Sequence, residues 1–261
     1  METTREPAVA GMFYPGDALV LQRTVDRLLE QAGREPNAAK AIIAPHAGYI
    51  YSGEVAARAY AALAARSGSI RRVVMAGPSH RVGFSGIAVP TARYFGTPLG
   101  RIPLDTAAIE SLADIPWVQR SDAPHAQEHC LEVQLPFLQT VLDEFSLVPL
   151  VVGQARPAEV DEVLERLWGG DETLIVISSD LSHYLPYSQA KAIDTQTSSA
   201  IEALREEDIG FDQACGALPV RGLLMAARSH GLHCRTVDQR NSGDTAGPRD
   251  QVVGYGAYVF E

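Results

Sequence analysis

The strongest constraint on the fold of this chain comes from its short runs of consecutive apolar residues. Each run has about the length of a β-strand, and continuous rather than alternating apolar residues are typical of strands buried on both faces. We therefore expect a central sheet that is covered on both sides. The expected strands are KAIIAP (40–45), RRVVMAG (71–77), SLVPLVVG (146–153), TLIVIS (173–178) and QVVGYGAYVF (251–260).

Helical patterns alternate with these runs. The segment 52–66 gathers its apolar residues on one helix face, and Ser52 is its expected N-cap. Strands alternating with helices indicate a doubly wound α/β fold, with a central mixed, largely parallel sheet flanked by helices on both faces. No internal repeat or long linker divides the chain, so we expect one domain over residues 1–261. Further helices are expected over 156–170, 188–206 and 218–231.

The composition narrows the class of function. The net charge is −10, which opposes a broad phosphate-binding surface, so we expect no nucleic-acid partner. No apolar run is long enough for a transmembrane helix, and the N-terminus lacks the apolar core of a signal peptide, so we expect no membrane partner. Three widely spaced cysteines fit a reducing compartment, and we expect the protein to be cytoplasmic.

Three histidines follow expected strands. They are His46 in IIAPHAGY, His80 in VVMAGPSH and His183 in VISSDLSHY. Ligands of open α/β sheets bind outside the carboxyl ends of the strands, so the three imidazoles could share one crevice. A single histidine in such a place is usually a hydrogen-bonded loop residue. The repetition favours a shared site, but both interpretations stay open on this evidence.

Cys215 is a fourth candidate. It precedes the helix expected to start near Pro219, and a helix N-terminus stabilises a thiolate. One thiolate with two imidazoles suits iron, copper or zinc. The alternative is a small buried apolar residue, the common fate of a free cysteine. Cys130, in a helical run, and Cys234, in an apparent strand, are expected to be structural.

The stretch PHAQEHCLEVQLPFLQ adds His125, Glu128 and His129. The two histidines are four residues apart, but the glutamate does not follow the first one, so the zinc-protease motif is absent. His129 could support a ligand, donate a proton or bind substrate. Asp180 could orient an imidazole or cap a turn. The chain has no Walker phosphate loop and no serine nucleophile elbow.

The motifs together resemble the Memo family, called AmmeMemoRadiSam system protein B in microbes. The resemblance implies a fold like that of the class III extradiol dioxygenases, non-haem iron enzymes with a mixed sheet between helices. No single motif is decisive, but their shared order over nearly the whole chain is specific. The motifs are REPAVAGMFYPGD, IIAPHAGYIYSG, MAGPSH, TPLGRIPLD, EHCLEVQLPFLQ, VPLVVG, SSDLSHY, CGALPV and VGYGAYVF.

The resemblance also implies roles for individual residues. His46 and His80 match the family's metal-binding histidines, and Cys215 matches its third ligand, where the dioxygenases have a glutamate. His183 matches the acid–base histidine of the dioxygenases, and His129 a further site histidine. The expected substrate-binding residues are Phe13, Tyr49, Asp180 and Glu128.

The motifs and the family resemblance lead to three candidate classes of function. The first is an Fe(II)-dependent oxygenase or related redox enzyme for a small phenolic substrate, with copper or zinc as alternative metals. The second is a non-catalytic module that keeps the pocket to bind metal or a peptide. The third is a metal-dependent hydrolase, ranked last because no carboxylate is clearly placed beside the proposed ligands. The resemblance suggests other AmmeMemoRadiSam proteins as partners.

Overall fold

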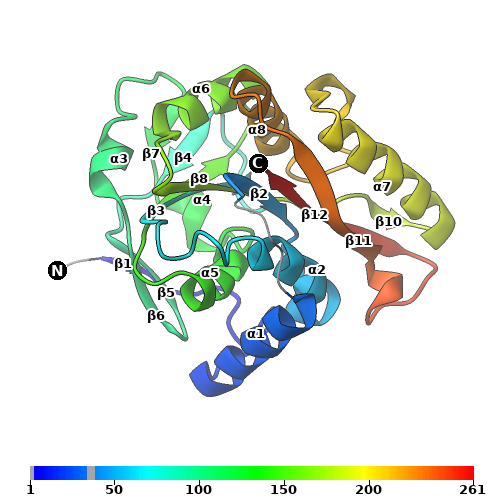
Figure 1. Ribbon diagram of the computed structural model, residues 1–261. Coiled ribbons are helices and arrows are strands. Elements are labelled where there is room, and N and C mark those ends of the chain that lie inside the picture. Colours follow the sequence, from blue (N-terminus) through cyan, green and yellow to red (C-terminus); the bar gives the residue numbers. More distant parts are fainter. Residues whose placement is uncertain (1–2, 34–38) are drawn as a thin grey trace.

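A mixed nine-stranded sheet runs through the centre of the molecule (Figure 1). The computed structural model describes residues 3–33 and 39–261. Along the sheet the order is β10-β12-β2-β9-β3-β8-β4-β7, and β11 also pairs with β12. The strands are β2 (Ala41–Ala44), β3 (Arg72–Pro78), β4 (Ile87–Val89), β7 (Val118–Arg120), β8 (Ser146–Val152), β9 (Thr173–Ser178), β10 (His183–Leu185), β11 (Cys234–Asn241) and β12 (Val252–Phe260).

The central strands β2, β9, β3 and β8 are parallel, whereas β12 and β4 join them in antiparallel pairs. The sheet is therefore parallel at its centre and mixed toward its edges. A separate three-stranded sheet has the order β1-β5-β6. Its strands are β1 (Thr4–Arg5), β5 (Tyr94–Thr97) and β6 (Gly100–Pro103).

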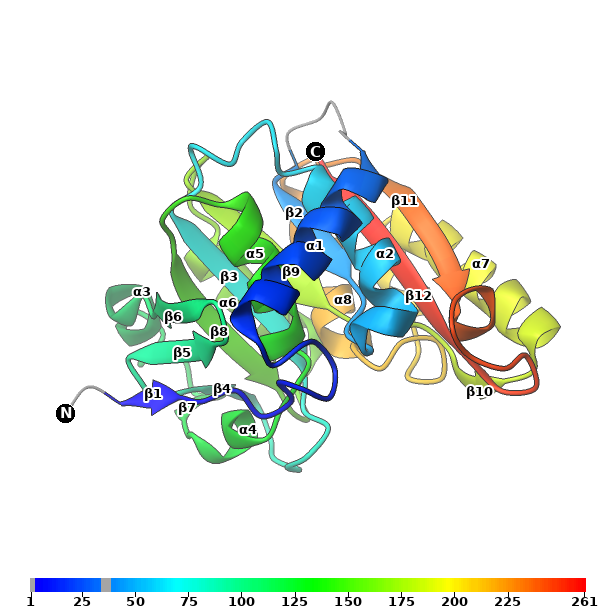
Figure 2. The same cartoon turned by 90° about the horizontal axis from the view of Figure 1, so that it is seen from below.

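Helices cover both faces of the large sheet (Figures 1 and 2). Helices α1 (Ala18–Ala32), α2 (Tyr49–Ala61) and α5 (Leu135–Val141) lie on one face, and α6 (Pro157–Leu167), α7 (Tyr187–Glu202) and α8 (Ala217–Ser229) on the other. The prediction of a mixed sheet between two helical layers is confirmed. The short helices are α3 (Thr106–Glu110), α4 (Ala123–Ala126), η1 (Glu132–Gln134), η2 (Glu206–Asp208) and η3 (Ser242–Asp244).

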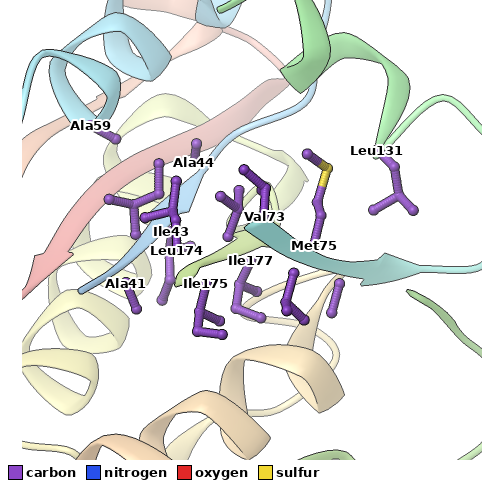
Figure 3. Packing of buried hydrophobic residues seen from close by; sticks show 14 of the residues in the cluster. Ala41, Ile43, Ala44, Ala59, Val73, Met75, Leu131, Leu174, Ile175 and Ile177 are labelled. Carbon is purple, nitrogen blue, oxygen red and sulfur yellow. The ribbon is translucent and has the colours of Figure 1, made fainter. Parts of the chain in front are cut away.

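The apolar runs that predicted the strands form the core (Figure 3). Ile43, Met75, Ile175 and Ile177 are at most 1% exposed. Burial of an aliphatic side chain of this size stabilises a fold by about 1.5–3 kcal/mol relative to exposure. The central strands are therefore held from both faces, and loops at their ends can carry polar groups.

Two local predictions were wrong. Helix α2 begins at Tyr49, three residues before the expected start. The Tyr49 amide donates to the Phe13 carbonyl, which fixes the helix start there. Ser52 lies within the first turn instead of capping it, and its Oγ donates to the Ala47 carbonyl. Cys130 lies in a turn between α4 and η1 rather than in a helix. The Glu128 carboxylate accepts the Cys130 amide there, in place of a helical carbonyl.

A buried carboxylate ties the N-terminal segment to the fold. Glu132 is fully buried and pairs with the guanidinium of Arg5. It also accepts the amides of Ala8 and Val9 at 2.7 and 3.0 Å and the Tyr14 hydroxyl at 2.6 Å. Both carboxylate oxygens are satisfied, so the burial of this charge is compensated.

We predict that Glu132→Gln lowers the free energy of unfolding by about 3–5 kcal/mol, because Arg5 keeps a buried charge that has lost its partner. Urea denaturation measures the effect. Glu30→Gln, which alters an exposed carboxylate on α1, is the control and should change little. Equal stability of the two variants would contradict the assigned role of Glu132.

Candidate metal centre

Polar residues follow three adjacent parallel strands at the carboxyl ends of those strands. His46 lies two residues after β2, Asp180 two residues after β9 and His80 two residues after β3. The strand order β2-β9-β3 therefore places Asp180 between the two histidines in the sheet. The same spacing after each strand points all three into the crevice where α/β sheets bind ligands.

Two imidazoles and one thiol converge at this edge. The ligand-type atoms of His46, His80 and Cys215 all lie within 4.8 Å of one another. Cys215 Sγ is 3.3 Å from His46 Nε2, and the rings of His46 and His80 have centroids 5.1 Å apart. Cys215 reaches the cluster from the turn before α8, as its amide bonds the Asp180 carbonyl.

Hydrogen bonds determine which nitrogen of His46 faces the cluster. Ser178 Oγ donates its one proton to the Cys130 carbonyl at 2.6 Å and accepts from Gln134 Nε2. The same oxygen lies 3.0 Å from His46 Nδ1, so Nδ1 must carry the proton and donate. Nε2 is then bare and faces Cys215. Burial and the nearby His80 lower the pKa of His46 well below its usual value, which keeps the ring neutral.

Glu128 orients His80 in the same way. Its carboxylate accepts from His80 Nδ1 at 2.8 Å and from the His80 amide at 2.6 Å. Burial opposes ionisation of Glu128, but the bonds and charge attraction of His80 outweigh burial and lower the pKa to about 2. The carboxylate accepts the Nδ1 proton of His80, so Nε2 is the His80 nitrogen that a metal can reach. Metal-bound histidines typically donate their other ring N–H to a carboxylate in this way.

His129 lies beside the cluster with its polar atoms less constrained. Its ring stacks on His80 at 4.8 Å and contacts Phe13 at the same centroid distance. His129 Nδ1 is 3.3 Å from a Glu128 oxygen but outside hydrogen-bond geometry, and no described residue bonds it. Burial and the neighbouring His46 lower its pKa to about 4. A second group that could hold a metal combines His80, Glu128 and His129.

The donors fit a soft or borderline metal ion. Burial, with the charge of Asp180, raises the pKa of the Cys215 thiol to about 12. The thiol therefore keeps its proton until a cation replaces it, as happens when a metal binds a buried cysteine. Two imidazole nitrogens and one thiolate form a donor set that iron, copper and zinc accept.

A pocket of about 570 Å³ opens over the histidines. His183 stands on its wall, with Nδ1 2.8 Å from the Leu181 carbonyl, so its Nε2 is free to exchange a proton. Asp180 also borders the pocket, where one oxygen accepts the His46 amide at 2.7 Å and the other is 3.9 Å from His46 Nε2. The lining residues are Phe13, His46, Ala47, Gly48, Tyr51, His80, Arg81, His129, Asp180, His183, Tyr184, Ser242, Gly247, Pro248, Val253 and Tyr255.

A second pocket, of about 920 Å³, also borders the cluster. His80 lines both pockets, whereas Cys215 lines the second and His46 the first. The second pocket has an apolar wall that includes Phe84, Phe211 and Leu218. The donor cluster is therefore bordered by a histidine-rich pocket and by an apolar one.

The structure separates the expected site residues into three groups. His46, His80, His129, His183, Asp180 and Phe13 line the pocket, and Cys215 joins their cluster. Glu128 lies behind His80 rather than on the pocket surface. Tyr49 does not line the pocket, because its ring is buried in the core and its hydroxyl bonds the Val133 carbonyl.

Sequence reasoning missed several pocket residues. Tyr51 takes the place expected for Tyr49, and Tyr184 follows His183 directly, so proximity to a motif was a usable signal for both. Tyr255 lies within the final strand, and residues 242–248 come from a distant loop without a motif. His230 lies outside the pocket, and its Nε2 is 2.9 Å from a carboxylate oxygen of Glu165.

Within residues 3–33 and 39–261, no helix is both long enough and apolar enough to cross a membrane.

Comparisons with known proteins agree over nearly the full length. A family model described as Memo-like protein matches residues 5–259. A "MEMO1 family protein" of Aquifex aeolicus is 38% identical, and one of Ignicoccus hospitalis is 35% identical, each over 98% of both chains. The crystal structure of an uncharacterized Escherichia coli K12 protein matches with a TM-score of 0.52 at 13% identity, covering 84% of this chain and 98% of that one. This last likeness concerns the fold alone.

We predict that acid destabilises the protein partly through His125, from the same motif as Glu128. His125 is buried, Nε2 donates to the Ala88 carbonyl at 3.0 Å, and burial lowers its pKa to about 4. The unfolded chain binds this proton near pH 6.5, so stability is full above that pH and falls as pH drops toward 4. The loss from this residue is about 3 kcal/mol.

Urea denaturation between pH 7 and 4 measures this effect. His125→Gln, which retains a donor, should flatten the decline, whereas His233→Gln, at an exposed histidine, should not. An unchanged pH dependence in His125→Gln would show that the decline has another origin.

Proposed function

Since the chain belongs to the Memo-like protein family, as its motifs indicated, we propose that it binds a metal through His46, His80 and Cys215 and acts as an oxygenase or related redox enzyme on a small phenolic substrate. The observation that carries the proposal is the convergence of two imidazole nitrogens and one thiol within 4.8 Å. Fe(II) is the proposed metal, and copper and zinc are the alternatives that this donor set also accepts.

The residues around the proposed metal have separate roles in this reaction. A bound metal would polarise a substrate oxygen and allow electron transfer with dioxygen as the oxidant. His183 accepts or returns a proton at Nε2, because its Nδ1 proton is held by the Leu181 carbonyl. Phe13, which packs on His129, shields one wall from water. Asp180 holds the backbone of His46 through its amide.

A metal-binding role without catalysis is the second candidate. The observation that favours it is the thiol of Cys215, because a thiolate is softer than a carboxylate and is itself oxidised by dioxygen. Such a protein would bind metal tightly and turn over no phenol. The two candidates therefore agree on the ligands and differ in the reaction.

We predict about one metal ion per chain after anaerobic purification and Fe(II) loading, measured by elemental analysis. His46→Ala, His80→Ala and Cys215→Ala should each weaken metal affinity at least about tenfold, because one of three protein ligands is lost. His230→Ala, which removes a histidine outside the cluster, is the control. Circular dichroism checks that each variant is folded.

Oxygen consumption by the iron-loaded protein with a panel of phenols and catechols separates the two candidates. Uptake that depends on His183 supports the enzyme. Metal bound by the three residues without uptake supports the non-catalytic role. A chain that binds no metal, or binds it equally after all three substitutions, would refute both.

We also predict that Glu128→Gln weakens metal affinity by about 10–100-fold while the three ligands remain, because the carboxylate that holds the Nδ1 proton of His80 loses its charge. Competition with a chromophoric chelator measures the affinity. Glu165→Gln alters a similar histidine–carboxylate pair at the surface and is the matched control. Identical affinities in the two variants would contradict the supporting role of Glu128.

A further inference from the structure

The histidine-lined pocket has one guanidinium on its rim. Arg81 directly follows His80, is exposed and lines the same pocket. Across residues 3–33 and 39–261, no side chain or carbonyl forms a hydrogen bond or ion pair with it. A charge in this position is available to a ligand without first breaking an internal contact.

Several other surface arginines are engaged by carboxylates. Arg156 pairs with Glu159 at 2.8 Å, Arg228 with Glu206 at 2.8 Å, and Arg240 also has carboxylate partners. The chain has a net charge of −10, so carboxylates are abundant around its surface. Such a field repels anions, and an anionic ligand therefore needs a local cation to hold it.

The carboxylate that borders the same pocket does not neutralise Arg81. Asp180 accepts the His46 amide and lies 3.9 Å from His46 Nε2, at the base of the pocket. Glu128 points to His80 from behind. The rim therefore offers a positive charge, while the negative charges are already engaged among the histidines.

The pocket walls between Arg81 and the histidines are suited to binding an aromatic ring. Phe13, Tyr51, Tyr184 and Tyr255 all line the pocket. Tyr184 is 70% exposed and has a φ of 58°, a left-handed conformation that costs a residue other than glycine about 1 kcal/mol or more. An exposed aromatic side chain held in this conformation beside His183 provides a face against which a substrate ring can pack.

We propose that Arg81 selects a phenol that carries a carboxylate, binding the carboxylate at the rim while the aromatic walls hold the ring and the phenol oxygen points to the histidines. The inference rests on the proposed function and narrows its substrate class from small phenols to phenolic acids. A guanidinium suits this task because its paired donors match the two oxygens of a carboxylate.

Isothermal titration with three probes tests the proposal. The probes are 4-hydroxyphenylacetate, its neutral methyl ester and the cationic amine tyramine, measured on the iron-loaded protein without oxygen and on the metal-free protein. The acid should bind about tenfold more tightly than the ester, and the amine most weakly. The preference should shrink as sodium chloride is raised, because salt screens exposed charges.

Arg81→Ala should remove the preference for the acid and leave the affinity for the ester within about twofold, whereas Arg81→Lys should retain part of it. Arg23→Ala removes an equal charge from the exposed side of α1, outside the pocket, and should leave the preference intact. The proposal is overturned if the acid does not bind, if acid and ester bind equally, or if Arg81→Ala keeps the preference.

These outcomes are independent of those that test the metal and the reaction. A preference for the acid without metal binding or oxygen uptake would support the anion site and refute the proposed enzyme. Metal binding and oxygen uptake with no charge preference would support the enzyme and refute the role of Arg81.

Discussion

The parallel pairing of β2, β9 and β3 is the interaction on which the candidate site depends. In this pairing Ala44 lies opposite Ser178, and Ile177 opposite Ala76. The three strands therefore end within one residue of one another, and the second residue beyond each end is a histidine, an aspartate and a histidine. The buried isoleucines that hold this register contact no ligand, yet a slip of one residue would turn alternate side chains to the opposite face of the sheet and disrupt the convergence.

Buried hydrogen bonds then determine which nitrogen each imidazole presents to the cluster. Ser178 and Glu128 each hold the Nδ1 proton of one imidazole, so that both rings offer Nε2 to the same space. Both supporting groups are nearly inaccessible to solvent, and each is satisfied by several partners. Burial of such groups is costly unless they are paired. These paired groups therefore hold each imidazole ring in a defined orientation. A metal site requires such an orientation, whereas a histidine at the surface does not.

The sequence predicted the parts of the structure that depend on local pattern. Continuous apolar runs identified the central strands, and histidines just beyond them identified the edge where His46 and His80 meet. The start of α2 was not predictable, because its first amide bonds the distant Phe13 carbonyl. That shift decides which tyrosine lines the pocket, since residues two apart on a helix point in different directions. The loop 242–248 completes the pocket from the far end of the chain, and no local pattern encodes that contact.

The proposed chemistry turns on Cys215, because it is the sulfur donor among the three proposed ligands. Its thiol lies at the border of the apolar pocket, while His46 faces the pocket lined by aromatic rings and Arg81. A phenolic acid held by Arg81 would approach the cluster from the histidine side and leave the sulfur on the other. Under the proposed function, the substrate enters through the pocket that His46 and Arg81 line, whereas Cys215 borders the apolar pocket.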